Sequence, residues 1–121
     1  MLWVLKRIVI LQNSVDMTDL ISKLYSTDAS IYQTQPLAVK FLENRHDILS
    51  AIDDCAKKKL PLLGWDGGTS LTGQLIGKSV ILDASKHMNK VLELNLKEGW
   101  FRVEPGVVFS NLNVFLKRSF L

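Results

Sequence analysis

Short apolar runs and one helical stripe alternate along the first two thirds of the chain and predict its elements. The runs at residues 37–42, 60–63 and 80–83 are short and mostly apolar, which is typical of buried strands. Between the first two runs, Asn44 and Asp47 have the spacing of a capping box at the start of a helix. Five residues of that helix recur at helical spacing and are expected to face the core: Ile48, Leu49, Ile52, Cys55 and Ala56.

The last third of the chain has a different pattern. Leucines alternate with polar residues over 92–96, which predicts a half-buried strand, and a turn at 97–99 returns the chain as a partner strand over 100–104. Two further helices are expected, capped by Thr18 and Ser110. Buried strands joined through a helix imply parallel pairing by a right-handed crossover, and the hairpin adds antiparallel pairing. The fold class is therefore α+β with a mixed sheet and helices, or α/β with a mixed sheet.

The bulk composition of the 121 residues excludes several classes of protein. Apolar residues make up 47% and charged residues 22%, as in ordinary globular domains. The net charge is +3, but the basic residues form no stripe with aromatics, so we expect no nucleic-acid partner. The single cysteine, Cys55, allows no internal disulfide. The apolar opening is broken by Lys6-Arg7 and is too short for a transmembrane segment, so a soluble, cytoplasmic chain is expected.

A glycine-rich stretch over residues 64–74, G-W-D-G-G-T-S-L-T-G-Q, follows the second predicted strand. Gly67 and Gly68 can adopt conformations closed to other residues and allow a ligand to approach the main chain closely. Successive N–H groups in such a turn form a concave anion site, to which Thr69 and Ser70 add hydroxyl donors. The chemistry suits a diphosphate, and we expect a loop between two strands here.

Known phosphate motifs do not fit this stretch. A Walker loop needs a lysine directly before its Ser or Thr, and Gly68 occupies that place. A dinucleotide fingerprint of the Rossmann kind should open a helix, whereas this stretch leads through Gly77 to another predicted strand. From composition alone, an ordinary glycine-rich connection is an equal alternative.

Three further blocks of sequence surround the glycine stretch. Y-S-T-D-A-S-I-Y precedes it, and V-I-L-D-A-S-K-H-M-N-K-V-L-E-L-N and then V-E-P-G-V-V-F-S-N-L-N follow it. Together, in this order, the blocks resemble the N-terminal part of FAD-linked oxidases of the vanillyl-alcohol oxidase and p-cresol methylhydroxylase type. Within that family they are most similar to the D-lactate dehydrogenase and glycolate oxidase branch. The resemblance runs from about Leu24 to Leu116.

The resemblance implies a partial FAD-binding domain over residues 35–121, preceded by a helical or irregular lead-in over 1–34. The glycine loop would bind the FAD pyrophosphate through its N–H groups, and a second block would lie beside the flavin. The implied cofactor-binding residues are Gly64, Trp65, Asp66, Gly67, Gly68, Thr69, Ser70, Gly73, Gln74, Pro105, Gly106 and Val107. No histidine lies near the loop, so non-covalent FAD is expected, and we predict no catalytic residue and no metal ligand in this chain.

The chain departs from the family pattern in two ways. Trp65-Asp66 stands where the family usually has Arg-Gly, and a carboxylate has the wrong sign beside a diphosphate. Replacing the pair by Arg-Gly is therefore expected to strengthen FAD binding. Family members are several times longer, so the chain is expected to be inactive alone and to need the missing C-terminal part or a partner chain.

The parent enzyme would act on a 2-hydroxy acid such as D-lactate or glycolate. The alternatives are a non-catalytic remnant and an unrelated small nucleotide-binding module.

Overall fold

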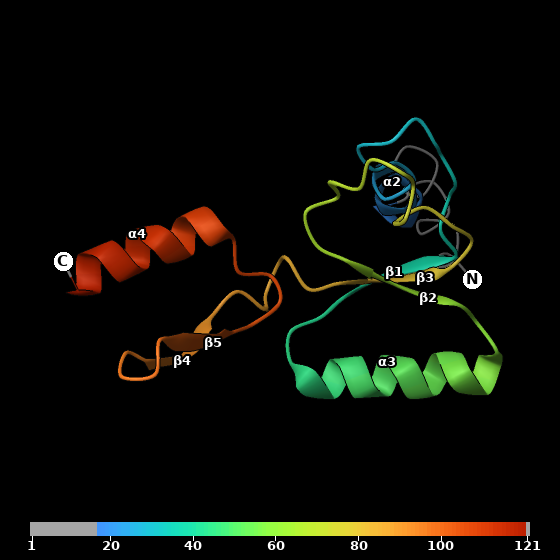
Figure 1. The fold of residues 1–121 in the computed structure, drawn as a ribbon. Coiled ribbons are helices and arrows are strands. Elements are labelled where there is room, and N and C mark those ends of the chain that lie inside the picture. The colour runs from blue at the N-terminus through green and yellow to red at the C-terminus, as the bar shows by residue number, and fades with distance from the viewer. Residues whose placement is uncertain (1–16, 121) are drawn as a thin grey trace, which may run out of the picture.

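A three-stranded parallel sheet forms the centre of the larger of two lobes (Figure 1). Its strands are β1 (Ala38–Phe41), β2 (Leu62–Trp65) and β3 (Val80–Asp83), in the order β1-β3-β2, so β3 lies between the two strands that precede it in sequence. The computed structural model describes residues 17–120. The expectations placed on the opening segment, 1–16, lie outside the described residues.

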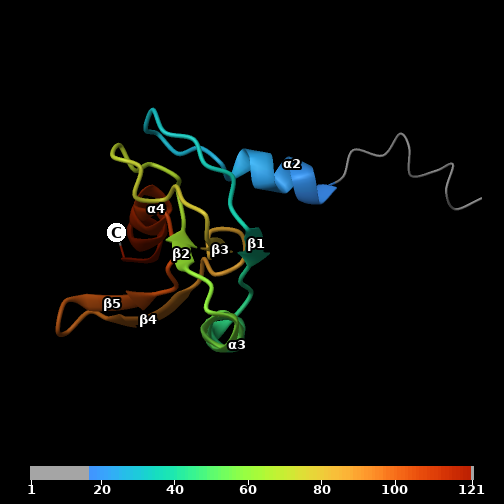
Figure 2. The same cartoon turned by 90° about the vertical axis from the view of Figure 1, so that its right-hand side faces the viewer.

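Two helices lie on opposite sides of this sheet. Helix α3 (Arg45–Lys58) connects β1 to β2 and lies along one face, while α2 (Met17–Leu24) lies on the other side near β1 (Figures 1 and 2). The core lies between α3 and the sheet. Its buried members are Leu42, Ala51, Cys55, Val80, Leu82, Ala84 and Met88.

Local sequence signals determine both ends of α3. The Asn44 side chain accepts hydrogen bonds from the main-chain N–H groups of His46 and Asp47, and the Asp47 carboxylate accepts from the Asn44 N–H, so the predicted capping box is confirmed. At the other end, Lys59 adopts a left-handed conformation (φ 54°), and its N–H group bonds the carbonyl oxygens of the last turn. A side-chain N-cap such as Asn44 stabilises a helix by about 1 kcal/mol.

The predicted core face of α3 is only partly correct. Ile48 and Cys55 pack toward the sheet as expected, but Leu49 is 55% exposed, Ile52 is 45% exposed and Ala56 is exposed. A sheet of three short strands covers a narrow arc of the helix. The buried arc is therefore the narrower one centred on Ile48, Ala51 and Cys55.

The smaller lobe consists of an antiparallel hairpin and the last helix. Strands β4 (Val91–Asn95) and β5 (Trp100–Val103) pair across a turn in which Gly99 has a φ of 73°, and α4 (Phe109–Phe120) follows. The predicted hairpin is confirmed, but its half-buried alternation is wrong for Leu92 and Leu96, which are exposed. The pairing register shifts near the start of β4, which breaks the alternation, and Leu96 lies beyond the strand in the turn.

The α+β class is confirmed, and the two kinds of pairing lie in two separate sheets rather than in one mixed sheet. Thr18 and Ser110 lie in the first turns of α2 and α4, one residue inside the helices they were expected to cap. Within residues 17–120, no helix is long and apolar enough to cross a membrane.

Candidate functional site: a glycine loop beside an apolar cleft

The glycine stretch forms the connection between β2 and β3. Strand β2 ends at Trp65 and β3 begins at Val80, and the residues between them are turns and bends without a helix. The predicted loop between two strands is therefore confirmed. The loop follows β2 and so starts at the carboxyl end of that strand. Since β2 and β3 are parallel, this is the edge of the sheet at which open parallel sheets characteristically bind ligands.

Four successive main-chain N–H groups in this loop have no hydrogen-bond acceptor in the part of the chain that the structure describes. They belong to Gly67, Gly68, Thr69 and Ser70. The loop is nevertheless held in place: the Gly68 carbonyl oxygen accepts from the Ala29 N–H at 3.0 Å. These N–H groups are therefore available to an anion, as the sequence pattern predicts.

The hydroxyl group of Ser70 is already used within the loop. It donates to Oε1 of Gln74 at 2.6 Å and accepts from the Gln74 N–H at 3.1 Å. These two hydrogen bonds join Ser70 to Gln74 and so stabilise the conformation of the loop, in addition to the contact with a cofactor predicted for both residues.

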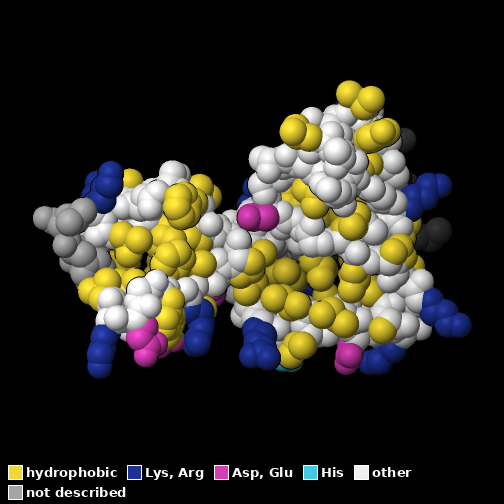
Figure 3. All heavy atoms as spheres, in the orientation of Figure 1, with side chains coloured by type: hydrophobic (Ala, Val, Ile, Leu, Met, Phe, Trp, Pro, Cys, Tyr) yellow, Lys and Arg dark blue, Asp and Glu magenta, His cyan; other side chains and the backbone are white. Residues whose placement is uncertain are grey.

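An open cleft of about 700 Å³ lies beside the loop, a size typical of ligand sites. In Figure 3, hydrophobic side chains gather in a hollow of the larger lobe beside the smaller one. Eight of the predicted cofactor-binding residues line the cleft: Gly64, Trp65, Asp66, Gly67, Thr69, Ser70, Gln74 and Pro105. The remaining lining residues are apolar: Leu42, Ile48, Leu75, Leu82 and Ala84.

Gly64 keeps this cleft open. It is exposed in β2, and a methyl group added to it would meet no atom within 4 Å. A side chain at this position would therefore occupy space that belongs to the cleft.

The structure does not bring the other four predicted residues to the cleft wall. Gly68 and Gly73 have positive φ angles of 66° and 74°, and each lies under an aromatic ring, that of Trp65 and that of Tyr32. Gly106 and Val107 line a separate cavity of about 320 Å³, whose wall also includes Leu112 and Phe115 of α4. Their contact with a flavin stays a prediction.

Gly106 has a packing role that the sequence alone does not reveal. It is buried, and an added methyl group would lie 2.6 Å from the carbonyl oxygen of Ala84 and 2.8 Å from that of Met88. Its own N–H donates to the Met88 carbonyl at 2.8 Å. Only glycine allows the start of the smaller lobe to approach the end of β3 so closely.

Trp65 and Asp66, which depart from the family pattern, lie in different environments. Trp65 is half-buried, with its ring 5.0 Å from that of Tyr25, whereas Asp66 is exposed at the cleft. Among the described residues that line the cleft there is no lysine or arginine. A diphosphate in this cleft would therefore be held by main-chain N–H groups, with a carboxylate nearby.

A buried acid under the loop has no role that the sequence assigns. Asp83, at the end of β3, is completely buried and accepts hydrogen bonds from the Tyr25 hydroxyl and, at 2.7 Å, from the Ser85 N–H. Burial, and then the bond to Asp83, raises the pKa of Tyr25 well above its ordinary value. Tyr25 and Asp83 are far apart in sequence, so no short-range pattern predicts their contact.

Neither histidine lies in the cleft, and both His46 and His87 are exposed. Over residues 17–120, no three or more His, Cys, Asp or Glu side chains are grouped so that they could hold a metal ion.

The fold of this chain is also found within a solved structure of a larger protein. The fold is similar to that of p-cresol methylhydroxylase, with a TM-score of 0.66 over 84% of this chain and 21% of that one, at 20% identity. In sequence, residues 36–121 match the family described as FAD binding domain, and the chain belongs to that family.

Curated relatives match the chain at higher identity. The chain is 41% identical over 95 residues to D-2-hydroxyglutarate dehydrogenase of Escherichia coli, covering 76% of this chain and 9% of that protein. It is 34% identical over 86 residues to the mitochondrial D-lactate dehydrogenase (cytochrome) of Kluyveromyces lactis, covering 68% and 15%. It is also 34% identical over 89 residues to glycolate oxidase subunit GlcD of Bacillus subtilis, covering 70% and 18%. The chain thus spans less than a fifth of these relatives.

Proposed function

We propose that this chain binds the diphosphate of FAD in its cleft, as the N-terminal portion of an oxidoreductase that acts on a D-2-hydroxy acid. The row of four unpaired N–H groups, Gly67 to Ser70, carries the proposal, because it lies beside a cleft that Gly64 leaves open. Family membership supports the cofactor. The substrate class follows from relatives named for D-2-hydroxyglutarate, D-lactate and glycolate, which are all 2-hydroxy acids.

In this proposal, the chain binds and orients the cofactor. FAD itself would supply the hydride acceptor. The loop N–H groups would hold the two phosphates, and the apolar wall, with Leu42, Leu75 and Leu82, would exclude water from the adjoining part of the molecule. We propose non-covalent binding, since no histidine or cysteine lies among the described residues that line the cleft. The buried, free Cys55 is compatible with the cytoplasm, which we keep as the proposed location.

The direct test is flavin retention. The purified chain is mixed with FAD, desalted and examined by visible absorbance, with free FAD carried through the same column as the control. We expect a flavin spectrum that travels with the protein and is released on acid denaturation. A fluorescence titration of FAD that shows no binding would contradict the proposal and favour a non-catalytic remnant.

We expect the chain alone, supplied with FAD, not to oxidise D-2-hydroxyglutarate, D-lactate or glycolate. Hydride transfer needs a base for the hydroxyl proton and cations for the carboxylate, both held against the flavin ring. Among residues 17–120, the candidate bases His46 and His87 lie outside the cleft, which is lined by no described cation. The measurement is dye reduction compared with free FAD. Turnover above that background would overturn this prediction.

We expect Asp66→Asn to strengthen FAD binding about threefold to tenfold, because it removes an exposed negative charge at the cleft. The gain should shrink as salt is raised, since salt screens exposed charges. Asp54→Asn, which removes an exposed charge on α3, is the matched control. The packing of Trp65 changes the expectation for replacing Trp65-Asp66 by Arg-Gly. The gain in FAD affinity should come from removing the Asp66 carboxylate, whereas loss of the Trp65 indole removes its contact with the loop at Gly68.

A further inference from the structure

An aromatic cluster lies under the glycine loop. The ring of Tyr25, which is buried, lies 5.0 Å from that of Trp65 and 6.0 Å from that of Phe41, the latter in an edge-to-face arrangement. The cluster joins the end of α2 to two strands of the sheet. Such ring pairs stabilise their arrangement by about 0.5–1.5 kcal/mol each beyond the area they bury.

The cluster is anchored at one end to the buried acid of β3. The Tyr25 hydroxyl donates to Oδ2 of Asp83, while Oδ1 of Asp83 accepts from the Ser85 N–H. Trp65 and Asp83 are register partners in the sheet, so the indole extends from the strand position next to this acid. Breaking the hydroxyl bond would leave a buried oxygen of Asp83 without its donor, which is unfavourable because solvent cannot replace the lost partner there.

The other end of the cluster contacts the loop at Gly68. A methyl group added to Gly68 would lie 2.9 Å from Cζ2 of the Trp65 indole, so the ring packs directly against the main chain at that position. On its carbonyl side, Gly68 is held by the Ala29 N–H. Gly68 has a φ of 66°, the left-handed conformation that turns successive N–H groups toward one side of a loop.

We propose that the Trp65 indole, held in place by Tyr25 and the buried Asp83, is a positioning residue that fixes the conformation of Gly68 and aligns the loop N–H groups for a diphosphate. This inference rests on the proposed function. It assigns to Trp65 a structural support for anion binding at a position where the family usually has an arginine. Since Tyr25 is not among the cleft-lining residues, its effect on a ligand would pass through Trp65.

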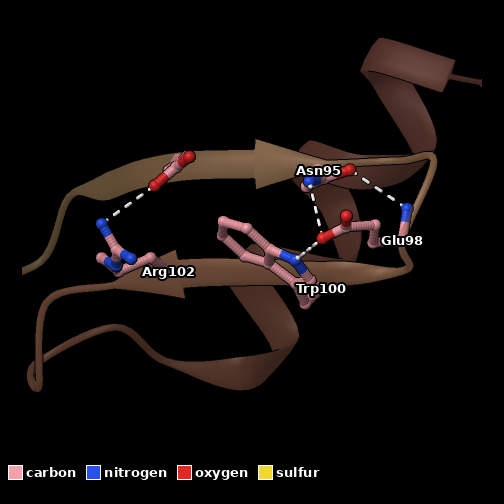
Figure 4. A network of polar contacts seen from close by, with 5 residues as sticks. Asn95, Glu98, Trp100 and Arg102 are labelled. Atoms are coloured by element: carbon pink, nitrogen blue, oxygen red, sulfur yellow. Dashed lines mark hydrogen bonds and ion pairs between the residues drawn. The ribbon is translucent and has the colours of Figure 1, made fainter.

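Two probes and three variants test the inference. The probes are FAD and inorganic pyrophosphate, titrated while the main-chain amide signals of Gly67 to Ser70 are followed by NMR. The variants are Trp65→Ala, Trp65→Phe, which keeps a ring, and Tyr25→Phe, which removes only the hydroxyl group. Trp100→Ala is the matched control, because Trp100 lies in the hairpin, where its indole N–H donates to Glu98 at 2.8 Å (Figure 4).

We expect Trp65→Ala to weaken binding of both probes about tenfold, the loss of about one hydrogen bond to a charged group. Tyr25→Phe should weaken binding less, shift the same amide signals and be less than additive with Trp65→Ala, because both act on one contact. Trp65→Phe should restore part of the affinity. Trp100→Ala should have no effect.

Wild-type affinity in both Trp65→Phe and Tyr25→Phe, with unchanged loop signals, would overturn the inference while the proposed function stands. The inference also fails if Tyr25→Phe and Trp65→Ala act additively, since Tyr25 would then act by a separate route. If the wild-type chain binds neither FAD nor pyrophosphate, the proposed function fails and the inference fails with it. Trp65→Phe and Tyr25→Phe keep these outcomes measurable should Trp65→Ala not fold, and additivity is then measured between those two variants.

Discussion

Gly106→Ala is expected to lower the free energy of unfolding by about 3 kcal/mol, the upper end of the cost of overpacking a buried site. The added methyl group would lie 2.6 Å from the Ala84 carbonyl oxygen, 2.8 Å from that of Met88 and 3.0 Å from Cα of Ser85. All three are main-chain atoms, which cannot rotate away as a flexible side chain would. The strand end and the turn after it must therefore move.

Chemical denaturation in urea, followed by circular dichroism, measures this effect as a shift of the unfolding midpoint. The matched control is Gly64→Ala, which adds the same methyl group where no atom lies within 4 Å. That control should leave stability unchanged or raise it slightly, since alanine restricts the unfolded chain. Equal midpoints for the two variants would show that the main chain around Gly106 accommodates the methyl group at little cost and that Gly106 has no special packing role.

The parts of the fold that the sequence predicts correctly depend on local patterns. The run Val80–Asp83 is continuously apolar up to its last residue, and all four residues are buried in the central strand. The N-terminal cap of α3 involves residues three apart, Asn44 and Asp47, so its signal is contained in a few positions. Gly99 is likewise predictable at the end of the hairpin turn, because a left-handed residue is needed there.

The parts that sequence patterns miss depend on distant partners. Periodicity describes a helix face but not the width of the sheet that covers it, which is why the prediction of Leu49 and Ile52 as core residues is wrong. Pairing in the order β1-β3-β2 and the bond between Tyr25 and Asp83 join segments far apart in the chain. No local pattern specifies such contacts.

The candidate site divides in the same way. The composition of the glycine loop predicts an anion site, and the resemblance supplies its cofactor and the residues around it. Neither shows that Trp65 packs on Gly68 while Asp66 is exposed to the cleft, although the two residues are neighbours in sequence. That difference depends on a distant partner, because the ring of Trp65, the last residue of β2, lies 5.0 Å from the ring of Tyr25, whereas Asp66 follows the strand in the exposed loop.

Gly64→Leu is expected to weaken FAD binding by about a hundredfold or more while leaving the fold intact. Gly64 is exposed in β2 and lines the cleft beside the glycine loop, and a side chain built on it would enter open space rather than the protein. A leucine would therefore fill part of the 700 Å³ that the ligand needs. The loss corresponds to about one or two hydrogen bonds to a charged diphosphate that can no longer form.

A graded series strengthens this test, because Gly64→Ala, Gly64→Val and Gly64→Leu should lower FAD affinity in the order of their side-chain volumes. Thr72→Leu is the matched control: residue 72 is exposed in the same loop but does not line the cleft, so the added leucine should leave FAD affinity unchanged. Unfolding midpoints measured alongside should stay within the range of the wild-type chain for all four variants. If Gly64→Leu binds FAD as tightly as the wild-type chain, the cleft is not the cofactor site and the proposed function is overturned.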